Sequence, residues 1–212
     1  MTFDRDRERH ILLGRELIRN TARALEETAA GLGHDFVDAV ELIARNKGRL
    51  STTGVGKSGQ VARKIAAMFS STGTPASFVH SSEAVHGDLG GLRRGDLVIV
   101  VSHSGETPEV VALLPMLKQL ELPIIAITDN IESSLSVVAN IVITGGAKSA
   151  ADPIGLAPTA SAAAATAIGD ALALAVAQHR GYKLEDFEHH PGGALGKLMD
   201  AVYKSAHDKS SG

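Results

Sequence analysis

Residues 97–120 read LVIVVSHSGETPEVVALLPMLKQL, and this stretch decides the class of fold. The apolar run LVIVV has the length of a buried strand, and a short polar turn around Gly105 follows it. From Pro108 onward, apolar residues recur at the spacing of a helix. A strand, a turn and a helix in this order are typical of the repeating unit of a parallel sheet.

The same pattern recurs on both sides of this stretch. Further runs of strand length lie at 49–53, 77–80, 124–128 and 141–144, and segments suited to crossover helices lie at 58–70, 108–120 and 133–140. The alternation predicts an α/β fold, with a doubly wound parallel five-stranded sheet flanked by helices. Because residues 97–101 form the most apolar run, we expect that strand near the centre of the sheet.

Helical patterns also occupy both ends of the chain. Residues 7–46 read as two amphipathic helices with a break at Gly31 and Gly33, and residues 158–179 form an Ala-rich helix. The small side chains of that helix would let another helix approach closely, either within the domain or between subunits. We therefore expect N-terminal helices over 1–46 that pack on the domain, a domain over 47–200 and a tail over 201–212.

The composition excludes several classes of protein. The 212-residue chain has no Cys and no Trp, 44% of its residues are apolar, and its formal net charge is −3. Disulfides, thiolate metal sites and Cys nucleophiles are impossible, so a cytoplasmic protein is the default. Scarce aromatics and weak charge argue against a nucleic-acid partner. The charged N-terminus and the lack of a long uninterrupted apolar stretch argue against a signal peptide and a membrane span.

A glycine-rich loop, TTGVGKSG at residues 52–59, follows the first strand. It does not match a nucleoside triphosphate loop, since Ser51 stands where Gly is needed, nor a dinucleotide loop, since the next strand ends at His80 instead of an acidic residue. Backbone N–H groups around Gly56 and the hydroxyl of Ser58 suit an anionic ligand at the start of a helix. The alternative is that the glycines only make a tight turn.

The second loop, SHSGETPE, places three hydroxyls around Gly105 immediately before Pro108. Ser102, Ser104 and Thr107 have the composition of a phosphate site that needs little positive charge. In open α/β sheets ligands bind at the carboxyl ends of the strands, where this loop lies. Alternatively, these hydroxyls are simple helix caps.

Candidates for proton transfer are spread along the chain. His86 lies in EAVHGDLG, a segment without strand or helix periodicity, and His190 precedes Pro191 in EHHPGGALG. The proline favours an extended conformation for His190, which could then reach a neighbour's site. Glu109 and Lys57 complete the set of candidates. Sequence spacing does not show that the four meet, and a locally satisfied surface histidine is the more common fate of any one His.

Taken together, these motifs resemble a known family. The segments TTGVGKSGQVARKIAAMFSSTGTPASFVH, EAVHGDLG, VSHSGETPEV, DPIGLAPTASAAAATAIGDALA and HPGGALG are similar, in order and spacing, to the arabinose 5-phosphate isomerases of the sugar isomerase (SIS) domain family. The resemblance covers roughly residues 30–200. It implies interconversion of D-ribulose 5-phosphate and D-arabinose 5-phosphate on the route to Kdo in lipopolysaccharide. It also implies a homotetramer with active sites shared between subunits.

The resemblance implies roles for individual residues. The phosphate would be bound by Ser58 with the backbone around Gly56, and by the second loop through Ser102, Ser104, Gly105 and Thr107. Proton transfers through a cis-enediol, with ring opening among them, would belong to His86 and His190, and stabilisation of the charged enediolate to Glu109 and Lys57. No cofactor and no metal is implied, although His86, His190 and Glu109 could form an adventitious, inhibitory zinc site.

Two features depart from the family pattern. Ala150 stands where family members commonly carry a Glu, so a carboxylate expected near the site is missing. Either Asp152 or Glu109 supplies that carboxylate, or the Glu is dispensable, or the activity is altered or lost. The chain also ends soon after HPGGALG, where long members continue into a pair of CBS domains, which fits either a short member or a truncated one. The alternatives are another phosphosugar isomerase, such as one for 3-hexulose 6-phosphate, and a sugar-phosphate sensor without catalysis.

Overall fold

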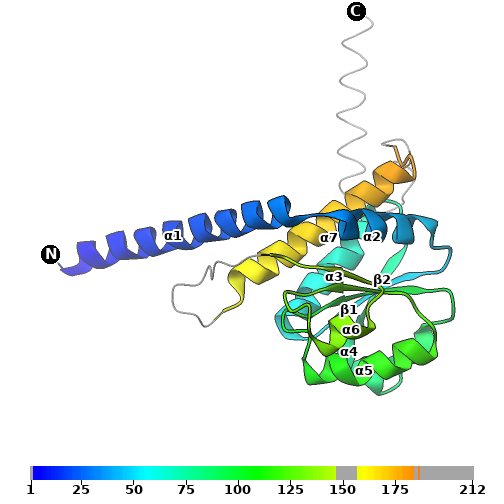
Figure 1. The fold of residues 1–212 in the computed structure, drawn as a ribbon. Helices are drawn as coiled ribbons and strands as arrows, with labels where there is room; N and C mark the ends of the chain where they lie inside the picture. The colour runs from blue at the N-terminus through cyan, green and yellow to red at the C-terminus, as the bar shows by residue number, and fades with distance from the viewer. Residues whose placement is uncertain (1, 147–156, 184–185, 187–212) are drawn as a thin grey trace, which may run out of the picture.

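The computed structural model describes residues 2–146, 157–183 and 186 (Figure 1). Along the chain these residues form α1 (Thr2–Gly31), α2 (His34–Arg45), β1 (Leu50–Gly54), α3 (Gly56–Ser71), β2 (Ala76–His80), α4 (Ser81–Val85), a 3-10 turn (Asp88–Gly91), β3 (Leu97–Val101), α5 (Pro108–Gln119), β4 (Ile124–Ile127), α6 (Ser134–Val138), β5 (Ile141–Ile143) and α7 (Thr159–His179).

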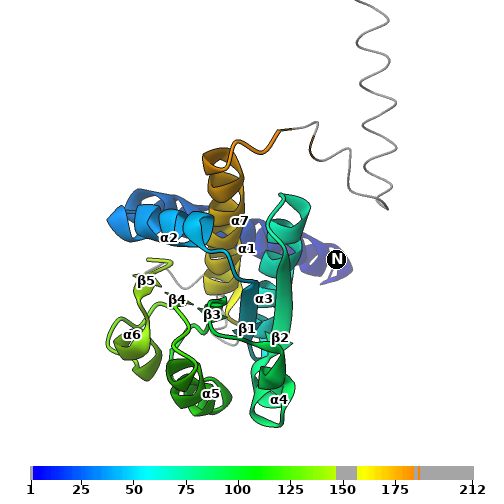
Figure 2. The same ribbon diagram turned by 90° about the vertical axis from the view of Figure 1, so that its right-hand side faces the viewer.

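The strands form one parallel sheet in the order β2-β1-β3-β4-β5. Figure 2 shows the five strands side by side, with β3 in the middle and helices on both faces. In the register of the sheet Leu50 lies opposite Leu97, and Val98 lies opposite Ile124. The predicted doubly wound α/β architecture and the central position of residues 97–101 are both confirmed.

Side chains of β3 alternate between two separate apolar layers, as the pleat of a strand requires. Leu97, Ile99 and Val101 pack with α2, α3 and α7 on one face. Val98 and Val100 pack with α4, α5 and α6 on the other face. All five side chains are buried, so β3 reads as a continuous apolar run and not as an alternating one.

The Ala-rich helix α7 packs closely against α3, as its small side chains predict. A Cβ at Gly169 would lie 2.2 Å from Cγ1 of Ile65, so only a glycine permits this approach. Figure 1 shows α7 also lying beside α1 and α2. By length and composition α7 could span a membrane, but its residues Ile168, Leu172 and Val176 are buried in the protein core.

The N-terminal helices differ in how much of them the domain covers. Ala39, Val40 and Ile43 of α2 are part of the core layer beneath α7. In contrast, α1 extends away from the sheet as a long arm, as Figure 1 shows, and its C-terminal part is tied down where Ala24 packs on Ala160. A buried hydrogen bond from Thr28 Oγ1 to Gly145 O joins the same part of α1 to the segment after β5.

Local structure departs from the sequence-based expectation between β2 and β3. Residues Ser81–Val85 form α4 and residues Asp88–Gly91 form a 3-10 turn, whereas the segment carries no visible periodicity. The short helix is set by a cap, because Nδ1 of His80 accepts a hydrogen bond of 3.3 Å from the Ser82 N–H. One turn of helix is too short to display an apolar period, and for this reason the sequence does not predict α4.

Candidate active site

A small pocket of about 50 Å³ lies at the carboxyl edge of the sheet. Its walls come from the ends of β3 and β4, the first turns of α3 and α7, and the segment after β5. The residues that line it are Lys57, Ser58, Val61, Val101, His103, Ile127, Thr128, Asp129, Gly145, Pro158, Ser161, Ala162 and Ala165. This is the edge at which doubly wound sheets bind their ligands.

The glycine-rich loop brings Lys57 and Ser58 to this pocket. Gly56 starts α3 with a φ of +59°, a conformation that favours glycine. Gly54 is needed for close packing, since a Cβ there would lie 2.8 Å from the Val101 carbonyl oxygen. The tight turn and the pocket-facing first turn of α3 are therefore two aspects of one arrangement, and neither interpretation excludes the other.

The second loop is held by its own hydroxyls. Ser102 is 1% exposed, its Oγ lies 3.0 Å from Thr107 Oγ1, and it accepts a hydrogen bond of 3.2 Å from the Gly105 N–H. Thr107 occupies the N-cap position of α5 without making a side-chain cap bond, so its hydroxyl is not a simple helix cap. Ser104 is exposed, and its Oγ accepts from the Glu106 N–H at 3.2 Å.

Gly105 allows this loop to pass close to α6. Its φ is +66°, and a Cβ there would lie 2.0 Å from Ser133 Oγ and 2.4 Å from Ser133 Cβ. Glu106, the next residue, accepts hydrogen bonds from the N–H and the hydroxyl of Ser134 at 2.6 and 2.9 Å. The loop is thus fixed to α6 on one side and borders the pocket through His103 on the other.

A hydrogen-bonded pair of side chains that the sequence did not suggest lies in the pocket wall. His103 Nδ1 is 2.8 Å from Asp129 Oδ2, and Asp129 Oδ1 accepts a hydrogen bond of 2.8 Å from the Gly145 N–H. His103 stands between the two serines of the second loop, and Asp129 follows β4. A search for charged residues just beyond neighbouring strand ends would have found the pair, because parallel strands finish at one edge.

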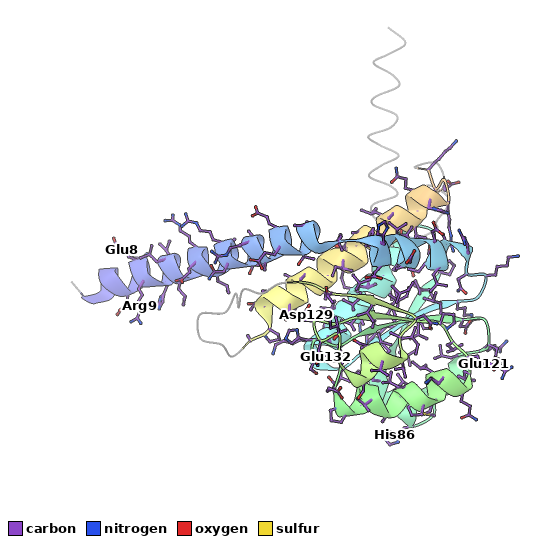
Figure 3. The ribbon with its side chains drawn as sticks, viewed as in Figure 1. Glu8, Arg9, His86, Glu121, Asp129 and Glu132 are labelled. Atoms are coloured by element: carbon purple, nitrogen blue, oxygen red, sulfur yellow. The ribbon has the colours of Figure 1, made fainter. Side chains whose placement is uncertain are left out.

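The predicted catalytic residues are only partly brought together. Lys57 lines the pocket, while Glu109 lies half-buried in the first turn of α5 and is not among the lining residues. His86 is exposed just after α4, and Figure 3 shows it on the side of α4 and α5, away from Asp129. His190, Ala150 and Asp152 lie outside the described residues.

The described residues do not support a zinc site at these positions. Within residues 2–146, 157–183 and 186, no three His, Asp or Glu side chains gather as metal ligands. The predicted adventitious zinc set also includes His190, which is outside that part of the chain. His86 and Glu109 by themselves do not form such a group.

A family model for the SIS domain matches residues 42–175. The chain belongs to the SIS domain family. The matched region begins in α2 and ends in α7, so it contains every strand, both predicted loops and all residues that line the pocket.

Two curated relatives of this SIS domain carry the name of an arabinose 5-phosphate isomerase. Arabinose 5-phosphate isomerase KdsD of Pseudomonas aeruginosa is 46% identical over 177 residues, which are 83% of this chain and 54% of that protein. KdsD of Escherichia coli K12 is 45% identical over 187 residues, 88% of this chain and 57% of that protein. The chain therefore spans about half the length of these relatives.

A solved structure shares both the fold and much of the sequence. The protein of E. coli CFT073 solved in complex with arabinose 5-phosphate superposes with a TM-score of 0.82 at 40% identity, and the match covers 85% of this chain and 96% of that one. The SIS domain described here therefore shares the architecture of almost the whole of that solved chain.

Proposed function

We propose that this chain is an aldose-ketose isomerase that interconverts D-ribulose 5-phosphate and D-arabinose 5-phosphate. The observation that carries the proposal is the pocket at the carboxyl edge of the sheet, where His103 of the loop Ser102–Thr107 lies in the same wall as Lys57 and Ser58. Relatives 43–46% identical to the chain bear the name of this activity, and a 40% identical protein was solved with arabinose 5-phosphate. The product would serve Kdo formation for lipopolysaccharide, in the cytoplasm.

The phosphate of the substrate would bind at the two loops. Hydroxyls of Ser102, Ser104 and Thr107 and the first turn of α3 at Gly56 and Ser58 supply hydrogen-bond donors, while the Gly105 N–H already donates to Ser102 Oγ and shapes the loop. The α3 turn also lies at the positive end of a 16-residue helix. Such a site holds a dianion mainly by hydrogen bonds, which leaves the cation Lys57 available for the sugar.

The reaction needs a carbon base and a group that stabilises an enediolate. We propose that Lys57 and Glu109 orient and stabilise the charged enediolate, and that His86 and His190 carry out the proton transfers. Because His86 lies away from the pocket of its own chain, we propose that it acts in the site of another subunit of a homotetramer. Residues 47–200 would form the SIS domain, with 1–46 packed on it and 201–212 as a tail. The chemistry requires no cofactor.

Incubation with ribulose 5-phosphate in deuterated water tests the activity. We expect arabinose 5-phosphate to form and deuterium to appear at the carbons adjacent to the carbonyl group, because the enediol exchanges protons with solvent. Binding without turnover or exchange would instead identify a sugar-phosphate sensor, an outcome that the replacement of a family Glu by Ala150 makes worth testing. Turnover of 3-hexulose 6-phosphate alone would identify a different isomerase.

Replacing Ser102 by Ala tests the phosphate loop. The variant loses the hydroxyl that bonds Thr107 and the Gly105 N–H. We expect KM for ribulose 5-phosphate to rise about tenfold, since a hydrogen bond to a charged group contributes about 1.5–3 kcal/mol, while kcat falls less. The matched control is Ser136→Ala on α6, whose KM should not change. Steady-state kinetics check both, and an unchanged KM in Ser102→Ala would contradict the loop's role.

A further inference from the structure

We propose that His103 and Asp129 form a proton-transfer pair, in which His103 moves a hydroxyl proton between the two oxygens of the enediolate and Asp129 positions it. This inference rests on the proposed isomerase function. It adds a fifth residue, His103, to the four candidates from the sequence, and assigns the hydroxyl proton to it, which leaves the carbon proton to the other histidines. His103 lines the pocket together with Lys57 and Ser58, whereas His86 of the same chain does not.

Hydrogen bonds hold both the side chain and the backbone of His103. Asp129 Oδ2 lies 2.8 Å from His103 Nδ1. The backbone carbonyl of His103 accepts hydrogen bonds of 3.1 Å from both Thr128 Oγ1 and the Asp129 N–H. The carboxylate is itself held, because Oδ1 accepts from the Gly145 N–H at 2.8 Å. The imidazole is thus attached to the ends of β3 and β4 and to the segment after β5.

This arrangement sets the tautomer of the ring. An ionised carboxylate can only accept a hydrogen bond, so Nδ1 of His103 must be the donor. The neutral ring then presents Nε2 as an acceptor, and no hydrogen bond from a described residue occupies that nitrogen. With 58% of its side chain exposed, His103 can reach a ligand at the mouth of the pocket. A histidine held in this way is suited to accept and return a hydroxyl proton.

The step that we assign to the pair is balanced. After a base removes the C1 proton of ribulose 5-phosphate, the enediolate carries its negative charge on O2 and a proton on O1. Nε2 of His103 accepts the O1 proton as the O1–H bond breaks, and then donates it to O2 as the O2–H bond forms. The charge moves to O1, which allows C1=O to form when C2 is protonated. The imidazole ends as it began, and no redox partner is needed.

Asp129→Asn is the sharpest test of this role. The Asn side chain keeps an oxygen for the Gly145 N–H, but its NH2 group donates towards His103 Nδ1. The ring must then carry its proton on Nε2, which can no longer accept one. We expect kcat to fall about 100-fold, the usual contribution of one general acid-base group, with little change in KM. Deuterium exchange at C1 should fall much less, because the carbon base is intact.

His103→Ala should show the same two effects, and the double variant should be no slower than His103→Ala alone, since Asp129 acts through the histidine. The backbone bonds of His103 persist in the alanine variant, and thermal unfolding checks that it folds. Asp38→Asn and His179→Ala, both exposed, are the controls and should retain wild-type kcat.

Three outcomes overturn the proposal. Unchanged kcat in Asp129→Asn and His103→Ala would remove the pair from the mechanism. An equal fall of isomerisation and C1 exchange would show that the pair acts on carbon or on folding, and not on the hydroxyl proton. Absence of both isomerisation and exchange in the wild-type protein would overturn the isomerase function itself, and that result is read separately from the variants.

Discussion

Replacing Gly105 by Ala should unfold the protein at a markedly lower temperature and abolish tight substrate binding. The φ of +66° costs a residue with a Cβ about 1–2 kcal/mol, and the new methyl would also collide with Ser133, whose Cβ lies 2.4 Å from its position. We expect a total loss of about 3 kcal/mol or more, which lowers Tm by roughly 6–12 °C for a chain of this size. KM should rise because the collision displaces the hydroxyl loop.

Gly146 provides the matched control for this substitution. Its φ is +60°, but among the described residues a Cβ there meets only the Glu27 carbonyl oxygen, at 3.9 Å. Gly146→Ala should therefore show the conformational cost alone, about 1–2 kcal/mol, with an unchanged KM. Calorimetry and steady-state kinetics on both variants separate the two causes. Equal Tm losses in the two proteins would show that the contact with Ser133 is unimportant.

Replacing Gly169 by Ala should destabilise the protein although alanine is the better helix former. The added methyl would lie 2.2 Å from Cγ1 and 2.5 Å from Cδ1 of Ile65, which is itself fully buried in α3. Forcing α3 and α7 apart costs typically about 1–3 kcal/mol, and this exceeds the gain in helix propensity of up to about 1 kcal/mol. Denaturant unfolding should show a lower midpoint.

The same substitution at Gly14 should have the opposite sign. This position lies in α1, and apart from the helix's own backbone no described residue comes within 4 Å of a Cβ built there. Gly14→Ala should raise helix stability by about 0.5–1 kcal/mol, as measured by circular dichroism.

Combining Gly169→Ala with Ile65→Ala should cost less than the sum of the single losses, because the smaller side chain makes room for the methyl. Strict additivity would contradict a direct contact.

The fold could be predicted from local patterns because each element carries its own signal. A five-residue apolar run such as residues 97–101, with a Gly-containing turn after it, is typical of a strand that is buried on both faces. The turn chemistry around Gly105 sets the start of α5. The α4 turn could not be predicted, since it depends on a single cap at His80 and on packing against α5. The arm-like extension of α1 likewise depends on tertiary packing, because α1 is tied to the start of α7 where Ala24 meets Ala160.

The sequence predicts the two loops of the candidate site, but it does not predict which of their side chains meet. Lys57, Ser58 and Ser102 stand in motifs whose strand-turn-helix context places them at the carboxyl edge. The sequence does not single out His103, because the hydroxyls of Ser102 and Ser104 on both sides of it already account for the motif SHSGETPE. Its partner Asp129 is 26 residues further along the chain, and only the order of strands reveals that β3 and β4 are neighbours. Sheet order is a tertiary property that no short sequence window contains.

The two edges of the sheet bear on the solubility of the folded protein. Unpaired N–H and C=O groups on an edge strand can recruit a strand from another molecule and begin aggregation. At one edge, β5 is only three residues long. At the other edge, the guanidinium of Arg63 on α3 lies 4.5 Å from the centre of the ring of Phe78 on β2. A short strand at one edge and a charged group over the aromatic side chain at the other oppose strand recruitment. The order β2-β1-β3-β4-β5 thus keeps the strongly apolar strands β3 and β4 away from both edges.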